Sequence, residues 1–167
     1  MASMTTRMKH EFKNDDGYNT TMEMWHSISH LIPKDKILFE AFMKDNWSSK
    51  SVLNLRELGF QTVGDPTVDF FGDIPEYDII VSNPPYSIKK KIFKRLGELD
   101  KPFILIVPMT TITKQFVRCL ERDKLQMIIP AKRLQFEKAG LPLNRCWFDC
   151  CFLCYKINLE RDITFLT

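Results

Sequence analysis

The chain has 167 residues, of which 44% are hydrophobic and 27% are charged, a composition expected of one soluble globular domain with a substantial core. We expect neither a membrane span nor a secretory signal, because no apolar run approaches the roughly 20 residues that cross a bilayer and no charged start precedes an apolar segment. The net charge is only +3, so the distribution of charge is more informative than its total.

The apolar pattern along the chain predicts strands that alternate with helices. A polar segment over 1–17 is expected to be flexible and to precede a single domain over 18–167. Strands are predicted at 36–40, 60–65, 77–82, 103–107, 125–129 and 147–157. Helices are predicted at 21–31, 49–58, 87–96 and 113–121. This alternation indicates an α/β fold with a doubly wound, mostly parallel sheet, in which the strand after a basic loop over 130–145 is expected to run antiparallel.

The cysteines indicate where the protein resides. They are Cys119, Cys146, Cys150, Cys151 and Cys154. An odd number with four in one predicted strand does not fit a secreted disulfide framework, so we expect an intracellular location, cytoplasmic or, for a eukaryotic or viral source, nuclear. Strand alternation places Cys146, Cys150 and Cys154 on one face and Cys151 on the other, where they cannot converge on a tetrahedral metal ion. We therefore expect buried thiols and no metal.

A rigid polar turn, Asn83-Pro84-Pro85-Tyr86, follows the predicted strand at 77–82. Consecutive prolines can continue neither a sheet nor a helix, because both lack an N–H and fix φ near −65°. The chain must therefore leave the sheet at the carboxyl end of a strand, which is where ligands bind in open α/β sheets. An amide, prolyl carbonyls and an aromatic ring are groups that could together hold a flat base.

This turn resembles the catalytic motif of S-adenosylmethionine-dependent methyltransferases that modify the N6 amine of adenine. The resemblance implies that the Asn83 side-chain carbonyl and the Pro84 backbone carbonyl accept hydrogen bonds from the two N6 hydrogens, on a turn that Pro85 keeps rigid. It also implies that Tyr86 stacks on an adenine extruded from its helix, and that Asn83 borders the cofactor. The expected fold is a Rossmann-like methyltransferase sheet, the expected cofactor is S-adenosyl-L-methionine and the expected partner is DNA or RNA.

The resemblance also places cofactor-binding residues upstream of the turn. Glu40 and Phe42 match the acid and the phenylalanine of a cofactor loop that continues through Asp45 and Asn46. Lys44 and Asn46 stand where glycines are common in the family, although asparagine tolerates a positive φ better than most residues. An ordinary connection between a strand and a helix remains an alternative for this stretch.

Two acids follow at positions where the family contacts the cofactor. Asp65 ends the predicted strand at 60–65, where an acid hydrogen-bonds a ribose diol in doubly wound folds; a turn aspartate before proline is the alternative. Asp69 and Phe70 resemble the segment beside the cofactor adenine, with the acid on the adenine amine and the ring packed on the base. A core phenylalanine beside a solvated aspartate is the alternative.

Near the start of the predicted domain, Tyr18 and Thr20 resemble residues that close over the methionine moiety of the cofactor. Thr20 fits another role equally well. It can cap the first helix, with Glu23 three residues later completing a capping box.

Positive charge gathers directly after the turn. Residues 86–95 carry five cations and no acid, and they begin at the expected base pocket, so contact with phosphates is predicted. A solvated helix face is the alternative. Arg133, in the basic loop over 130–145, belongs to a segment similar to one that lies near the substrate in phage-type adenine methylases, and the resemblance implies that it too binds phosphate. The helix residues assigned to phosphate binding are Lys89, Lys90, Lys91 and Lys94.

Only twelve residues separate Asp65 from Asp78, too few for the strand and helix that usually intervene in this family, so we expect a sheet trimmed by one strand. No separate target-recognition domain fits either, so sequence specificity is expected to be slight, to depend on the structure of the substrate, or to be supplied by a partner chain. The first hypothesis is an adenine-N6 methyltransferase acting on nucleic acid, with DNA slightly ahead of RNA. The alternatives are a catalytically inactive methyltransferase-like module that binds nucleic acid or a partner protein, and a methyltransferase that modifies a protein glutamine amide.

Overall fold

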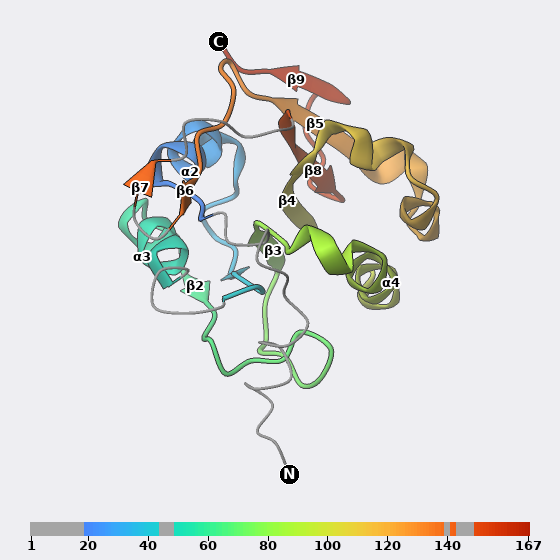
Figure 1. Cartoon of the computed structure of the whole chain (residues 1–167), viewed down its shortest axis with the longest axis horizontal. Helices are drawn as coiled ribbons and strands as arrows, with labels where there is room; N and C mark the ends of the chain where they lie inside the picture. Colours follow the sequence, from blue (N-terminus) through green and yellow to red (C-terminus); the bar gives the residue numbers. More distant parts are fainter. Residues whose placement is uncertain (1–18, 44–48, 139–140, 143–148) are drawn as a thin grey trace.

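The computed structural model describes residues 19–43, 49–138, 141–142 and 149–167 (Figure 1). Over these residues a seven-stranded sheet has the order β2-β1-β3-β4-β8-β5-β9, and a separate two-stranded sheet pairs β6 with β7. The segment over 1–17, expected to be flexible, lies outside the described residues.

The large sheet is mostly parallel. Neighbouring strands among β1, β2, β3 and β4 run parallel, whereas β8 is antiparallel to both of its neighbours, β4 and β5. The edge strand β9 is again parallel to β5. The strands are β1 (Leu38–Phe39), β2 (Thr62–Val63), β3 (Ile79–Ser82), β4 (Phe103–Pro108), β5 (Leu125–Ile129), β6 (Glu137–Lys138), β7 (Leu141–Pro142), β8 (Cys150–Tyr155) and β9 (Ile163–Phe165).

The helices alternate with the parallel strands. The first is α2 (Met22–Ile28), which continues into the 3-10 turn η2 (Ser29–Leu31). The connection from β1 to β2 is α3 (Ser49–Glu57), and Gly59 follows it with a φ of 91°, the left-handed conformation that commonly ends helices. The connection from β3 to β4 is the 3-10 turn η3 (Tyr86–Ile88) followed by α4 (Lys89–Leu99).

Helices cover both faces of the sheet, with α2 and α3 on one side and α4 on the other (Figure 1). Trp25 of α2 and Leu55 of α3 belong to the first core cluster, together with Ile104 and Phe152 of the sheet. The second cluster joins the buried face of α4, which includes Phe93, to strand residues on the opposite face of the sheet. The core is thus two apolar layers that hold the sheet between them.

The observed architecture confirms the expected α/β class, with a doubly wound, mostly parallel Rossmann-like sheet and an antiparallel strand after the long loop. Residues 64–78, all of them described, contain neither helix nor strand, so the connection from β2 to β3 lacks a strand as expected. The antiparallel strand β8 is not the last one, however. The short strand β9 follows it and was not predicted.

The helix predicted at 113–121 is wrong. This connection consists of short 3-10 turns, η4 (Met109–Thr113), η5 (Gln115–Cys119) and η6 (Arg122–Lys124). Lys114 is extended, with a φ of −79° and a ψ of 144°, and interrupts any helix there. The hydroxyl of Thr113 donates to the carbonyl of Thr110 at 2.7 Å, a local bond that competes with helical pairing.

The cap of the first helix is displaced by one residue. The side chain of Thr21, not of Thr20, accepts a hydrogen bond at 3.4 Å from the backbone N–H of Met24. Thr20 is buried instead. The capping role expected for Thr20 is therefore wrong.

The described cysteines alternate as predicted, with Cys150 and Cys154 in one core cluster and Cys151 in the other. Cys146 lies outside the described residues. Burial raises the pKa of Cys151 to about 11 and that of Cys154 as well. In the part of the chain that the structure describes, no group of three His, Cys, Asp or Glu side chains is arranged to hold a metal ion. Over the same residues, no helix has the length and apolar character needed to cross a membrane.

Candidate active site

The strand order places a topological switch point at the carboxyl ends of β1 and β3. These two strands are neighbours, with Phe39 opposite Ile80. From β1 the chain crosses through α3 to β2 on one side, and from β3 it crosses through α4 to β4 on the other side. Connections that diverge in this way leave a ligand-binding crevice outside the strand ends. Glu40, directly after β1, and Asn83, directly after β3, stand at this point.

Glu40 ties three elements together at the crevice. Its side chain is only 4% exposed, and both carboxylate oxygens accept hydrogen bonds. The hydroxyl of Ser51, in α3, donates to Oε2 at 2.6 Å, and the hydroxyl of Ser82, the last residue of β3, donates to Oε1. The indole N–H of Trp25 in turn donates to Ser51 Oγ at 2.8 Å. The network therefore fixes the end of β1 against α2, α3 and β3.

Burial raises the pKa of Glu40 from 4.5 to about 7, since a charged carboxylate is poorly solvated there. The hydrogen bonds from Ser51, Ser82 and the backbone N–H of Phe42 act in the opposite direction, because they favour the charged form. Burial is the larger effect. The carboxyl group thus changes its charge near neutral pH, which an exposed glutamate does not.

A glycine brings the end of β2 close to Glu40. Gly64 has a φ of 152°, and a Cβ at this position would lie 2.6 Å from the backbone carbonyl oxygen of Glu40. Only glycine fits such a close approach of two backbones. The next residue, Asp65, is exposed, and its Oδ1 accepts hydrogen bonds from the backbone N–H of Thr67 at 2.7 Å and from the Thr67 hydroxyl. Asp65 therefore stands at the same sheet edge as Glu40 within a local turn.

The turn after β3 is held rigidly against the sheet. Pro84 and Pro85 are buried, while Asn83 and Tyr86 are half-buried. The Tyr86 hydroxyl donates to Asn83 Oδ1 at 3.2 Å and lies 3.5 Å from the carbonyl oxygen of Ile106 in β4. It also lies 3.8 Å from Cys150 Sγ. The hydroxyl thus orients the Asn83 amide and contacts both β4 and β8.

The basic helix starts where the turn ends. Lys89, Lys90, Lys91 and Lys94 are all exposed on α4. Lys91 Nζ lies 4.2 Å from the ring centroid of Phe71, a cation–π contact. Arg95 has a different role, because its guanidinium donates to the backbone carbonyls of Phe70 and Gly72 and holds the connection from β2 to β3.

Phe70, predicted to contact the cofactor adenine, is packed in the core. Its ring is fully buried and packs on Phe42, with the ring centroids 4.7 Å apart. This packing is that of the core alternative, and the contact of Phe70 with the cofactor adenine stays a prediction. Phe42 is itself only 7% exposed. Asp69 is half-buried, and its Oδ1 accepts from the backbone N–H of Phe71 at 2.9 Å.

The remaining predicted residues fall into two groups. Arg133 forms an ion pair with Asp149, with Nε 2.9 Å from Oδ1, and the Asp149 carbonyl accepts from the backbone N–H of Met109 at 2.9 Å. Arg133 is thereby linked to the residue that follows the carboxyl end of β4. Tyr18, Asp45 and Asn46 lie outside the described residues.

Three residues of the Glu40 network were not predicted: Trp25, Ser51 and Ser82. Ser82 has one signal in the sequence, since it is a polar residue at the end of an otherwise apolar strand and next to Asn83. Ser51 and Trp25 carry none, because they lie 11 and 15 residues from Glu40 on helices whose packing is set by the tertiary fold.

No protein-family model and no curated protein matches the chain. Among solved structures, the crystal structure of TrmN from Thermus thermophilus matches at a TM-score of 0.35 and 13% sequence identity, over 92% of this chain and 48% of that chain. This chain thus spans about half the length of that protein. The chemistry must accordingly be inferred from the site itself.

Proposed function

We propose that the chain is an S-adenosylmethionine-dependent methyltransferase that methylates N6 of adenine in nucleic acid, with DNA slightly ahead of RNA. The observation that carries the proposal is the placement of Asn83-Pro84-Pro85-Tyr86 at the carboxyl end of β3, beside the crevice between β1 and β3. That is the position at which an open α/β sheet binds its ligands.

Two acceptors in the turn suit an exocyclic amine. The lone pair of the adenine amine is delocalised into the ring, which makes N6 a poor nucleophile. In the proposed complex Asn83 Oδ1 and the Pro84 carbonyl accept the two N6 hydrogens and so favour an N6 whose lone pair points at the incoming methyl group. The rigid prolines keep these acceptors in place, and positioning of this kind accounts for much of catalysis.

When bound, S-adenosylmethionine supplies a methyl group on a positively charged sulfur. Asn83 and the Pro84 carbonyl would hold the N6 amine toward this methyl group, and water would take the proton that N6 loses on methylation. Tyr86 has two roles in this proposal. Its ring stacks on the base, and its hydroxyl orients the Asn83 amide.

The residues described at the crevice fit such a cofactor. Asp65 offers an exposed carboxylate just beyond the end of β2, where it would accept from the ribose diol. Gly64 removes the side chain that would separate β2 from Glu40. Asn83 would border the methyl donor from the side of β3. Tyr18, Asp45, Asn46 and Asp69 are proposed to complete the cofactor site.

The cations on α4 favour a substrate that carries phosphates. Lys89, Lys90 and Lys94 are exposed on a helix that starts directly after the turn. Phosphate contacts would orient a nucleic acid with one base at Asn83. Arg133, linked through Asp149 to the end of β4, would add a contact on the other side of the turn.

A second candidate is a catalytically inactive module that binds nucleic acid or a partner protein. The observation that favours it is the engagement of both Glu40 carboxylate oxygens by groups of the chain itself. The presence of Lys44 and Asn46 at positions where glycines are usual in the family also favours the inactive module.

Calorimetric titration with S-adenosylmethionine distinguishes the two candidates, and a labelled-methyl assay on DNA, RNA and protein pools then identifies the substrate. We expect cofactor binding, methylation of adenine, and at least a hundredfold loss of turnover in Asn83→Ala with cofactor affinity nearly unchanged. Leu53→Ala, an exposed position on α3, serves as the control. No binding at millimolar cofactor would exclude the enzyme, and full activity of Asn83→Ala would exclude the role given to the turn.

A further inference from the structure

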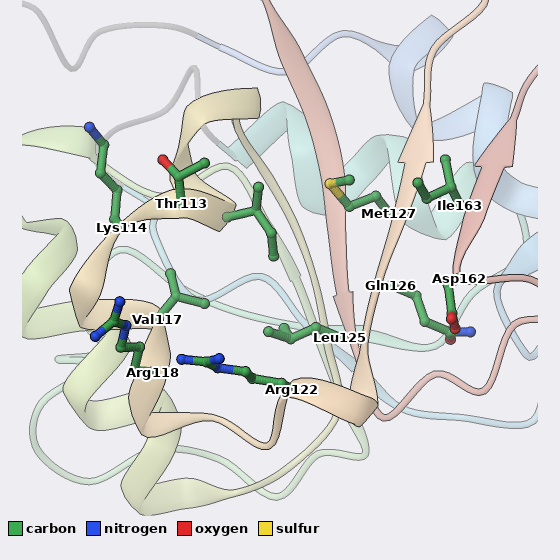
Figure 2. A pocket seen from close by; sticks show the side chains of 11 residues that line it. Thr113, Lys114, Val117, Arg118, Arg122, Leu125, Gln126, Met127, Asp162 and Ile163 are labelled. Atoms are coloured by element: carbon green, nitrogen blue, oxygen red, sulfur yellow. The ribbon is translucent and has the colours of Figure 1, made fainter.

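Among the residues that the structure describes, no α-helix connects β4 to β5 to cover the sheet there. The connection from β4 to β5, which in doubly wound sheets is normally a helix, consists here of the short turns η4, η5 and η6. Between these turns and the strands lies an open groove of about 440 Å³, floored by Leu125, Met127 and Ile163 (Figure 2). The groove lies apart from the turn at Asn83 and shares no residue with it.

The floor of the groove is apolar and accessible. The parallel register sets Ile163 of β9 opposite Met127 of β5, so the two side chains lie next to each other on one face of the sheet. Ile163 is 46% exposed, and Ile112, at the rim in η4, is 36% exposed. A concave patch of aliphatic side chains rimmed by polar groups marks an interaction site more often than an isolated surface leucine does.

Positive charge lines the rim formed by the turns. Lys114, Arg118 and Arg122 line the groove on the side formed by the turns, where Lys114 precedes η5, Arg118 lies in η5 and Arg122 begins η6 (Figure 2). All three are exposed, and none forms an ion pair with any residue that the structure describes. Asp162, on the strand side, is the one acid among the described residues that line the groove. An occupant is therefore expected to carry negative charge on the edge that meets the turns.

We propose that this groove is a docking site for an acidic amphipathic helix of a partner protein. An apolar stripe at i, i+3 or i+4, and i+7 would fill the floor, and acidic residues beside the stripe would meet Lys114, Arg118 and Arg122. The helix would take the place that a crossover helix usually holds on such a sheet. The proposal concerns a surface separate from the turn at Asn83 and does not depend on the methyltransferase assignment.

A nucleic acid fits this groove less well than a helix does. Bases bind non-specifically by stacking on aromatic rings, and none of the described residues that line this groove is aromatic. The phosphates of a nucleic acid would contact the cations, but the aliphatic floor would stay exposed to water. The combination of an apolar floor with a cationic rim on one side matches a helix that is itself apolar on one face and acidic beside it.

The test uses the full chain and a fluorescent helical peptide of about 16 residues, a length of about 24 Å, with leucines at helical spacing and glutamates beside them. Fluorescence anisotropy should give micromolar binding. Ile163→Glu should weaken it at least about tenfold, whereas Leu53→Glu, an exposed position on the opposite face, should change it less than about twofold. Circular dichroism melting checks that both variants fold.

Charge reversal provides a second, independent measurement. Arg118→Glu combined with Arg122→Glu should weaken the acidic peptide about tenfold and strengthen a version with lysines in place of glutamates, while Lys36→Glu near β1 should do neither. The proposal is overturned if the peptide does not bind up to about 1 mM, if a peptide with its leucines scrambled binds as well, or if Ile163→Glu binds it unchanged. It is also overturned if a single-stranded oligonucleotide binds the groove in an Ile163-dependent way and the peptide does not.

Discussion

Replacing Glu40 by glutamine should remove a pH dependence of stability that this side chain creates. Glutamine keeps the length of the side chain and one acceptor oxygen, but it has no acidic proton to release. Its amide N–H can donate to the hydroxyl of Ser82, which can accept as well as donate. The variant therefore mimics the protonated state of Glu40 at every pH.

The magnitude follows from the pKa of the buried group. Burial raises the pKa of Glu40 from 4.5 to about 7, so between these values the folded chain keeps a proton that the unfolded chain releases. The resulting stabilisation is fully present below the unfolded pKa and is lost as the pH rises through the folded pKa. A shift of about 2.5 pKa units corresponds to about 3 kcal/mol in the free energy of unfolding.

Urea unfolding measures this free energy for the wild type and Glu40→Gln from about pH 5 to pH 8. The difference between the two proteins isolates position 40, because other groups that titrate are common to both. We expect the wild type to lose about 2.5 kcal/mol relative to the variant over this range. Glu57→Gln, at the exposed end of α3, should show no such trend. If the free energy of unfolding of the wild type minus that of the variant stays constant or increases with pH, burial is not the dominant effect on the pKa of Glu40.

Two further predictions concern the sheet edge and the basic helix. Gly64→Ala should lower the free energy of unfolding by about 2–3 kcal/mol, because the added Cβ would meet the backbone of Glu40. Gly72→Ala is the control and should cost less than about 1 kcal/mol, because a Cβ there makes only ordinary van der Waals contacts. Urea unfolding measures both variants, and equal losses of stability would contradict the prediction. Replacing three exposed α4 lysines by alanine should reduce the steepness with which the logarithm of the nucleic-acid binding constant falls with the logarithm of the salt concentration, by about 2–3. Lys36→Ala is the control. An unchanged slope in the triple variant would show that α4 is not part of the binding surface. The three lysines are Lys89, Lys90 and Lys94.

The parts of the fold that could be predicted are those whose signal is local. The run of five apolar residues before Pro108 predicts a strand because burial on both faces leaves a continuous apolar run. The 3-10 turns after β4 could not be predicted, since their form depends on contacts with α4. There, Gly97 admits Cys119, whose thiol donates to the Phe93 carbonyl at 3.2 Å. The three-residue strand β9 exists only through its pairing with β5.

In the candidate site, too, the features with a local sequence signal could be predicted and those that depend on tertiary contacts could not. The turn at Asn83 is predictable because two prolines and a preceding apolar strand determine where the chain leaves the sheet. The hydrogen bond from Ser82 to Glu40 joins residues 42 positions apart, and that from Trp25 to Ser51 joins residues 26 apart, so neither has a local signature. The burial of Phe70 likewise depends on its packing against Phe42, which a motif match does not reveal.

The insertion of β8 between β4 and β5 has a consequence for how the protein is made. On the ribosome β4 and β5 are both synthesised before the strand that joins them, so the sheet stays divided until Tyr155 has emerged. The long sequence separation between β4 and β8 slows their pairing, since a large loop must close first. Cys150, the first residue of β8, lies against the hydroxyl of Tyr86. The turn at Asn83 is thus synthesised early, but its surroundings are completed only when β8 has been made.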